Sequence, residues 1–358
     1  MRILLAAPTF GVHGGIEAFV MALADWLGRN TRHEVRVCFK LVARRAASEA
    51  LRTRCERLQL DYHFVRSASV ELLANLRWAH VVHANNCSPD IVLPAKALGR
   101  PVILTIHNWF RGRSGLRNRL WYVCSRIADR RVYNSNFVWS TWEPVRALRG
   151  SERMPTVSHL PTATVPFELR RGFCFVARLI ANKGLENLVA AYERAHVDKD
   201  LWPLYIVGDG PLRPWLESYV RERVVRGVHC LGYVPEEEKF RIIAGCRWLV
   251  APANTREDMG LTPIEARNVA VPAIVTRDGG LPESAGSSAL LSEPGDELEL
   301  QANLERAARM AEEEYRERAN SAKQSLNGYL RPLSEYLQIY DILDRKRRGR
   351  SRERGLAR

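Results

Sequence analysis

The chain has 358 residues, of which 46% are hydrophobic, a composition typical of a globular protein with about two domains. It contains no run of about 18 apolar residues, and its first apolar segment is too short for a secretory signal, so neither a membrane-spanning nor an exported protein is expected. The net charge of +14 favours nucleic acid, an anionic membrane or anionic substrates as partners, while seven scattered cysteines without a C-x-x-C pair argue against a disulfide framework or zinc site and favour a reducing cytoplasm.

Strand-like and helix-like segments alternate from the start of the chain. Residues 2–7 predict a strand, and Ile16 to Leu27 predicts a helix because its apolar residues recur at helical spacing. Further strands are predicted at residues 35–39, 79–83, 101–106 and 130–133. A glycine- and proline-rich break follows at residues 150–170.

A second alternating series follows the break. Its predicted strands are residues 173–176, 204–207, 228–231, 247–251 and 272–276. Repeated alternation of strand and helix predicts parallel sheets covered by helices, so we expect an α/β protein with two Rossmann-like domains facing a cleft.

The predicted boundaries place the first domain at residues 1–166 and the second at 167–330. Residues 299–326 are charged and are predicted to be helical, and residues 331–344 predict a last helix that crosses back to the first domain. Residues 345–358 form a strongly basic tail that we expect to be disordered.

Two loops that follow predicted strands carry candidate phosphate-binding residues. Gly14 and Gly15 lie between the first strand and the first helix, where glycine lets the backbone approach a ligand closely. Arg178 and Lys183 follow the strand at 173–176, and two cations there can clamp a diphosphate. The alternatives are a plain tight turn for the glycines and a solvated basic loop for the cations, and the glycine spacing does not favour a dinucleotide cofactor.

The segment from Glu257 to Glu265 is the most informative in the chain. It places two carboxylates eight positions apart, around Gly260, after a strand and at the start of a helix. A helix N-terminus attracts phosphate, and carboxylates accept hydrogen bonds from sugar hydroxyls. The competing interpretation makes Thr262 the N-cap of a capping box in which Glu265 bonds back to the Thr262 backbone.

Two features of the first half suggest further contacts. His107 ends the strand at 101–106, where a polar side chain points into the cleft of such folds, although a structural histidine is the alternative. The segment Trp109 to Arg119 interleaves aromatic residues with arginines, which fits an anionic glycan, nucleic acid or a membrane surface, or else a charged loop in water.

The order of these motifs resembles the large group 1 family of retaining glycosyltransferases, also described as family 4-like, which have the GT-B fold. The resemblance is strongest over residues 173–283, including the segment Gly279-Gly280-Leu281-Pro282-Glu283. It implies that Gly14 and Gly15 contact the diphosphate of a nucleotide-sugar donor, which Arg178 and Lys183 hold.

The resemblance also implies roles for the remaining residues. Glu257 lies near the transferred sugar and Glu265 on the ribose, while His107 sits near the reacting carbon. The backbone near Tyr233 and Val234 meets the base. The backbone amides of Met259, Gly260 and Leu261 face phosphate and sugar.

The implied reaction transfers a hexose from a UDP- or GDP-sugar to a hydroxyl of a glycan or lipid-linked acceptor in polysaccharide biosynthesis. It needs no metal and no cofactor, since the nucleotide sugar is a substrate. We expect a cytoplasmic enzyme, peripheral on the inner face of the membrane, and we do not expect nucleic acid as a partner. Two rivals stay open: a nonhydrolysing sugar-nucleotide epimerase of similar fold, and a noncatalytic binder of nucleotide sugars or nucleic acid.

Overall fold

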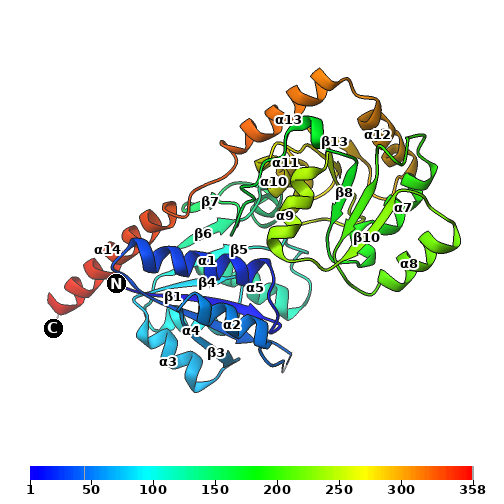
Figure 1. Cartoon of the computed structure of the whole chain (residues 1–358). Coiled ribbons are helices and arrows are strands. Elements are labelled where there is room, and N and C mark those ends of the chain that lie inside the picture. Colours follow the sequence, from blue (N-terminus) through cyan, green and yellow to red (C-terminus); the bar gives the residue numbers. More distant parts are fainter. Residues whose placement is uncertain (44, 357–358) are drawn as a thin grey trace. The chain divides into compact units, whose positions relative to one another are not determined.

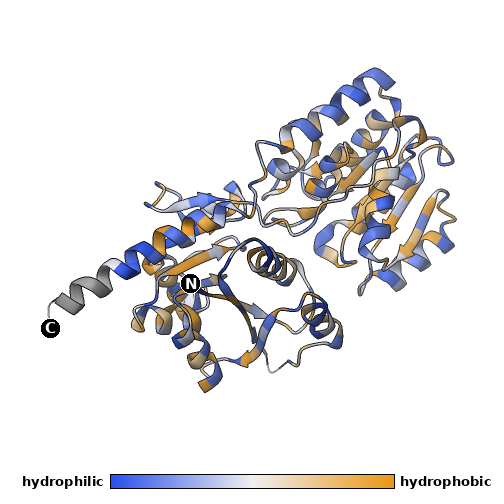
Figure 2. Cartoon of the chain, turned by 60° about the vertical axis from the view of Figure 1, so that its left-hand side comes forward, coloured by the Kyte–Doolittle hydropathy of each residue, from blue (hydrophilic) through white to orange (hydrophobic). Residues whose placement is uncertain are grey.

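The computed structural model describes residues 1–43 and 45–356. The chain divides into two compact units, which we call unit 1 (Met1–His159 with Arg331–Arg358) and unit 2 (Leu160–Leu330). The division therefore lies at residue 160, somewhat before the predicted boundary at 167. Figure 1 follows the chain through both units, and Figure 2 shows apolar residues concentrated on the strands and alternating with hydrophilic ones on the helices.

Unit 1 is built on a parallel sheet with seven strands in the described part of the chain. In spatial order the strands are β3 (Asp61–Arg66), β2 (Glu34–Leu41), β1 (Arg2–Thr9), β4 (Val81–Asn85), β5 (Val102–Ile106), β6 (Arg130–Tyr133) and β7 (Ser151–Arg153). The strands β3 and β7 were not predicted. The first is half-exposed and polar at the sheet edge, and the second lies inside the segment expected to be a linker.

Helices cover both faces of this sheet. They are α1 (Gly15–Asn30), α2 (Glu49–Arg57), α3 (Val70–Trp78), α4 (Pro89–Ala97), α5 (Gly115–Ile127), α6 (Asn136–Trp142) and α14 (Glu335–Leu356). Alternate residues of β1 face opposite sides, so Ile3 and Leu5 pack with α1, α2 and α14, whereas Leu4 and Ala6 pack with α3 to α6.

Helix α14 supplies part of the core of unit 1. Tyr336, Ile339, Tyr340 and Leu343 are buried against β1, β4 and α1. Helix α14 continues as far as Leu356, through most of the segment expected to be disordered, while residues 357 and 358 lie outside the described part. The packing of its first half against unit 1 nucleates a helix that the basic composition alone does not predict.

A buried hydrogen-bond chain joins α14 to the sheet. The imidazole of His83 on β4 bonds the Tyr340 hydroxyl through Nδ1 and the Thr105 hydroxyl through Nε2, each at 2.7 Å. Burial lowers the pKa of His83 to about 3, so the ring is neutral and has one donor and one acceptor. The hydroxyls of Tyr340 and Thr105 therefore provide the hydrogen-bond partners of both buried ring nitrogens of His83.

Replacing Tyr340 by Phe tests this anchor. The substitution keeps the ring but leaves a buried nitrogen of His83 without a partner, which costs about 1–3 kcal/mol. We expect the amides of α14 to exchange with deuterium roughly tenfold faster or more, measured by mass spectrometry. Tyr62→Phe is the matched control because its hydroxyl bonds Glu56 at an exposed site. Equal exchange rates in Tyr340→Phe and wild type would contradict the anchoring role.

Unit 2 is built on a second parallel sheet, with six strands among the described residues. In spatial order these are β10 (Val228–Gly232), β9 (Leu204–Val207), β8 (Phe173–Val176), β11 (Trp248–Ala251), β12 (Ala273–Thr276) and β13 (Leu290–Ser292). The helical segments are η1 (Phe167–Leu169), η2 (Ala181–Lys183), α7 (Leu185–Arg194), α8 (Arg213–Glu222), α9 (Glu236–Gly245), α10 (Leu261–Asn268), α11 (Leu281–Ala285), α12 (Glu297–Arg309) and α13 (Glu312–Leu326). Two apolar clusters, one on each face, hold the helices to the sheet.

The charged helical segment predicted at residues 299–326 consists of two helices. The backbone is extended at Met310 and Ala311, where α12 ends and α13 begins. Three glutamates, residues 312–314, open α13, and acidic residues are favoured at a helix N-terminus because they complement its dipole. This charge pattern was present in the sequence and could have located the break.

Candidate active site

The strand order of unit 2 identifies where a ligand would bind. From the centre of the sheet, β8, β9 and β10 follow one another to one edge, and β11, β12 and β13 follow one another to the other edge. The strand order therefore reverses between β8 and β11. Ligands of open α/β sheets bind outside the carboxyl ends of the strands at such a switch point. Arg178 and Lys183 follow β8 and Glu257 follows β11, so the topology places these predicted residues at this point.

The loops after β8 and β11 are bonded directly to each other. The amide of Asn254 donates to the carbonyl of Asn182 at 3.0 Å, and the side chain of Asn187 donates to that of Asn254 at 3.3 Å. Gly184 has φ +72°, and a Cβ there would lie 1.7 Å from the carbonyl oxygen of Pro252. Only glycine permits this approach of the two backbones, which brings the side chains of the two loops into contact.

Lys183 and Glu257 form an ion pair across the two loops. Nζ lies 2.6 Å from Oε1, and the side chains are 23% and 20% exposed. Arg178 is exposed, and its guanidinium has no hydrogen bond or ion pair with any described residue. The site therefore holds one cation on a carboxylate and a second cation open to solvent.

The Gly279-Gly280 segment supports the loop that carries Glu257. The amide of Gly280 donates to the Glu257 carbonyl at 2.7 Å. Gly279 has φ +64°, and a Cβ there would lie 2.4 Å from the same carbonyl oxygen. The segment therefore fixes the backbone of Glu257 and leaves no room for a side chain.

Replacing Gly279 by Ala should displace the Glu257 loop. The positive φ and the backbone clash together cost about 1–3 kcal/mol, so we expect a lower melting temperature and loss of any activity that needs Glu257. Differential scanning fluorimetry measures the first effect. Gly245→Ala is the control, because nothing lies within 4 Å of the added Cβ at the end of α9. A melting temperature equal to that of wild type would show that the loop tolerates the extra methyl group.

Glu265 does not form the capping box that the sequence allowed. Helix α10 begins at Leu261 with Gly260 as its N-cap, at φ +88°, and no side chain caps it. The Glu265 carboxylate is 2% exposed and pairs through Oε1 with Nζ of Lys239 on α9, at 2.7 Å. Its Oε2 is buried and has no hydrogen-bond partner within residues 1–43 and 45–356.

A buried carboxylate oxygen without a donor is costly unless a ligand or water supplies one. Burial raises the pKa of Glu265, and the ammonium group of Lys239 opposes that rise. Lys239 therefore joins the candidate site through this ion pair, and sequence reasoning did not identify it. It follows three glutamates on α9, and nothing in the spacing signals a contact with α10.

Lys239→Met should destabilise unit 2 in a pH-dependent way. Burial raises the pKa of Glu265 in the folded state. Protonation of Glu265 therefore stabilises the folded state fully below the pKa of this group in the unfolded chain, and that stabilisation is lost as the pH rises through its folded-state pKa. Without Lys239 the folded pKa rises further, so we expect the variant to be about 1–3 kcal/mol less stable than wild type at pH 7.

The deficit should disappear below about pH 4, where Glu265 is protonated in both states. Urea unfolding of variant and wild type at pH 4 and pH 7 measures this difference. Lys323→Met, at an exposed position on α13, is the control. A deficit that is equal at both pH values would indicate lost packing instead of lost charge.

The other predicted donor contacts lie along the same edge of the unit 2 sheet. Met259 is buried and its carbonyl accepts a hydrogen bond from the Ser284 hydroxyl, while Gly260 and Leu261 form the start of α10. Tyr233 and Val234 follow β10, the outermost strand, with Tyr233 80% exposed. Two strand spacings, roughly 10 Å, therefore separate β10 from β8.

The remaining predicted residues belong to unit 1. Gly14 is the N-cap of α1 and Gly15 its first residue, directly after the carboxyl end of β1. His107 follows β5 and is 6% exposed, with Nε2 3.0 Å from the Asn85 side-chain oxygen and Nδ1 3.4 Å from the Thr156 hydroxyl. Burial lowers the pKa of His107 to about 3, so the ring is neutral, and its environment orients it firmly.

Two absences concern the described residues alone. No helix there has the length and apolar character needed to cross a membrane. In the same part of the chain, no group of three or more histidine, cysteine, aspartate or glutamate side chains gathers as metal ligands would.

Comparisons with known proteins agree with this architecture. The model of the family described as Glycosyltransferase Family 4 matches residues 13–143, and that described as Glycosyl transferases group 1 matches residues 170–310. The chain is also similar to Anabaena Alr3699/HepE, solved in complex with UDP, with a TM-score of 0.78 and 15% identity over 96% of this chain and 99% of that one. Sucrose-phosphate synthase from Thermosynechococcus elongatus gives a TM-score of 0.66 and 13% identity over 100% of both chains.

Curated relatives match over shorter segments. O-antigen chain mannosyltransferase B of Escherichia coli is 27% identical over 136 residues, which is 36% of this chain and 35% of the relative. O-antigen chain mannosyltransferase C of the same species is 33% identical over 103 residues, or 28% and 26%. The chain thus spans about a third or less of the length of these relatives.

Two Rossmann-like domains, each with a parallel sheet, give the chain the GT-B fold that its structural neighbours share. Each unit thus matches a glycosyltransferase family model, unit 1 over residues 13–143 and unit 2 over residues 170–310.

Proposed function

We propose that the chain is a retaining glycosyltransferase that moves a hexose from a nucleotide diphosphate to a hydroxyl of a glycan or lipid-linked acceptor. The observation that carries the proposal is the Lys183–Glu257 ion pair, 2.6 Å long, at the switch point of the unit 2 sheet. A cation and a carboxylate held together there match the two partners that a sugar diphosphate needs. The cation meets phosphate, and the carboxylate meets sugar hydroxyls.

The donor contacts follow from this arrangement. Lys183 exchanges Glu257 for the diphosphate, Arg178 adds the second positive charge, and the amides of Met259, Gly260 and Leu261 face phosphate and sugar. Glu257 then accepts from the transferred sugar. The unpartnered Oε2 of Glu265 accepts from a ribose hydroxyl, which removes the cost of its burial.

In the reaction, the bond between the anomeric carbon and the β-phosphate oxygen breaks, and its electron pair goes to the phosphate. The acceptor oxygen bonds to the same carbon from the same face, and its proton passes to the departing phosphate oxygen. Arg178, Lys183 and the backbone amides stabilise the charge that grows on the diphosphate. These groups take the place of a metal ion, so metal independence is part of the proposal.

The remaining contacts in this proposal come from residues of unit 1 and from two further residues of unit 2. Gly14 and Gly15 approach the diphosphate at the N-terminus of α1. His107 positions the sugar as a neutral ring, since its lowered pKa is unsuited to a cationic role. Tyr233 and Val234, from unit 2, meet the base of a UDP- or GDP-sugar.

The acceptor side of the proposal rests on surface chemistry and on relatives. The O-antigen mannosyltransferases support a role in polysaccharide biosynthesis. Three arginines lie over aromatic rings of unit 1, which gives it a basic aromatic surface. The distances from the guanidinium carbon to the ring centroid are 5.0 Å for Arg111 over Trp109, 3.9 Å for Arg113 over Tyr122 and 4.4 Å for Arg117 over Trp121. Such a surface suits an anionic membrane, so we propose a cytoplasmic enzyme that associates peripherally with its inner face.

Glu257→Gln tests the function. UDP-, GDP- and ADP-sugars are first screened for the one that raises the melting temperature, since a ligand that binds only the folded state stabilises it. Turnover of that sugar with a membrane extract as acceptor is then followed with radiolabel. We expect the variant to lose about 10²–10³ in rate, while the nucleoside diphosphate still raises its melting temperature.

Glu237→Gln on the exposed face of α9 is the control and should keep full activity. A wild type that binds a nucleotide sugar but labels no product and releases no nucleotide would be a noncatalytic binder. Interconversion of the sugar within the nucleotide would identify the epimerase. An unchanged rate in Glu257→Gln would reject the site.

A further inference from the structure

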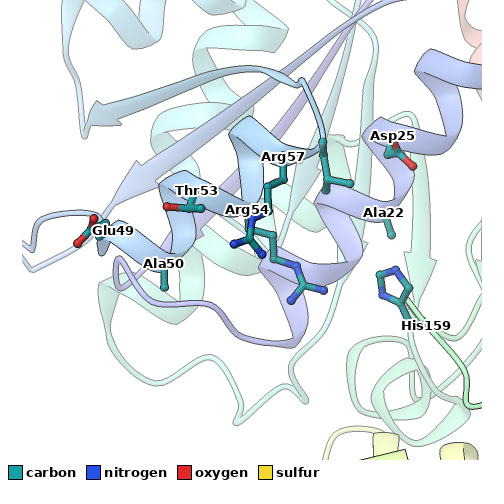
Figure 3. A pocket seen from close by; sticks show the side chains of 9 residues that line it. Ala22, Asp25, Glu49, Ala50, Thr53, Arg54, Arg57 and His159 are labelled. Atoms are coloured by element: carbon teal, nitrogen blue, oxygen red, sulfur yellow. The ribbon is translucent and has the colours of Figure 1, made fainter. Parts of the chain in front are cut away.

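A cavity of about 670 Å³ lies in unit 1, and none of the site residues predicted from the sequence lines it. Helix α1 forms one wall and helix α2 the other, and His159 closes one side (Figure 3). The small side chains of Ala22 and Ala50 leave the space between the helices open. Its remaining lining residues are Asp25, Glu49, Thr53, Arg54, Arg57 and Leu58.

The polar lining is biased toward groups that bind anions. Arg54 and Arg57 lie one turn apart on α2, and Figure 3 shows both reaching into the space in front of α1, opposite His159. Arg57 and His159 have no hydrogen-bond or ion-pair partner among the described residues. Of the two carboxylates, Asp25 is already neutralised by Arg29 at 2.8 Å.

The cavity lies on the same helix as the Gly14-Gly15 loop, which is proposed to contact the donor diphosphate. Helix α1 begins at Gly15, beside the carboxyl end of β1, and Ala22 lies roughly 10 Å further along the helix. A group anchored beside Ala22 therefore leaves space for about one or two sugar rings before the Gly14-Gly15 loop. This is the distance at which the anchor of an acceptor would lie, not the reacting hydroxyl itself.

We propose that this cavity binds the phosphate or diphosphate of a phosphorylated acceptor, with Arg54, Arg57 and His159 as its ligands. The inference rests on the proposed function, since it assigns the acceptor class for the same reaction. Guanidinium groups bind phosphate through paired N–H donors, and an imidazole N–H adds a further hydrogen bond. Two sources share this chemistry: a lipid-linked diphosphate and a soluble sugar phosphate.

A second cavity adjoins the first. It measures about 440 Å³, shares Asp25 and Leu58 with the first, and is walled in part by Val35, Val37 and Leu60. Asp25, Arg29 and Gln59 also line it, so a group attached to the phosphate, whether a lipid chain or a sugar, has room to extend there. The experiment therefore includes a lipid and a soluble probe.

The test uses the full chain with the donor site saturated by the nucleoside diphosphate that it binds, so that added phosphate cannot occupy Lys183. Inorganic pyrophosphate, geranyl diphosphate and glucose 1-phosphate are titrated, and the imidazole resonances of His159 are followed by NMR. We expect saturable shifts in wild type, and in Arg54→Gln/Arg57→Gln a Kd at least about tenfold higher.

Arg52→Gln is the matched control, because Arg52 lies on the same helix but stacks on Phe64 at 4.8 Å, outside the cavity. It should bind the probes as wild type does. If geranyl diphosphate binds more tightly than pyrophosphate does, the acceptor is lipid-linked. If glucose 1-phosphate binds as tightly as geranyl diphosphate or more tightly, the acceptor is a soluble sugar phosphate.

Unchanged His159 resonances with all three probes, or equal affinity in the double variant and wild type, would overturn the proposal. Circular dichroism and the melting temperature verify that the variants are folded. Failure of the proposed function has a different result: no nucleotide sugar gives a labelled product, while the His159 shifts with the three probes are measured independently of turnover.

Discussion

The candidate site depends on the direct contact between the loops after β8 and β11. Lys183 ends the short helical turn η2, and Glu257 lies in the loop between β11 and α10. Their pairing follows from the backbone bond between Asn254 and Asn182 and from the glycine that lets the two chains touch. A charged pair formed in this way costs little reorganisation when a ligand replaces one partner, because the loops are already in position.

The two carboxylates of the candidate site each pair with one lysine and can still accept further hydrogen bonds. Glu257 has Lys183, and Glu265 has Lys239. The second pair is almost fully buried, and a buried ion pair is weak support for stability because desolvation offsets the attraction. Because Oε2 of Glu265 also lacks a donor among the described residues, this pair leaves room for a hydrogen bond from a ligand or a water molecule.

Much of the fold followed from the sequence because its strands are continuous apolar runs between helical patterns, as buried parallel strands are. For the same reason, Arg178 and Glu257 could be placed after two of those strands, at the carboxyl edge of the sheet. Strand β3 was missed because an edge strand buries only part of its surface. Lys239 was missed because its partner lies on another helix, a contact that packing creates and that no local spacing reports. Glu265 shows the converse: a local rule predicted a cap, and the left-handed Gly260 started the helix earlier.

The return of α14 to unit 1 has a consequence for how the chain acquires its structure during synthesis. Domains generally fold in the order in which they leave the ribosome. Here the first half of the chain emerges without the tyrosines and aliphatic residues of α14 that complete its core, whereas unit 2 is one continuous segment. The later domain can therefore mature first, while the earlier one exposes an apolar groove until residues near 343 are translated. That interval is when chaperones would be expected to bind the nascent chain.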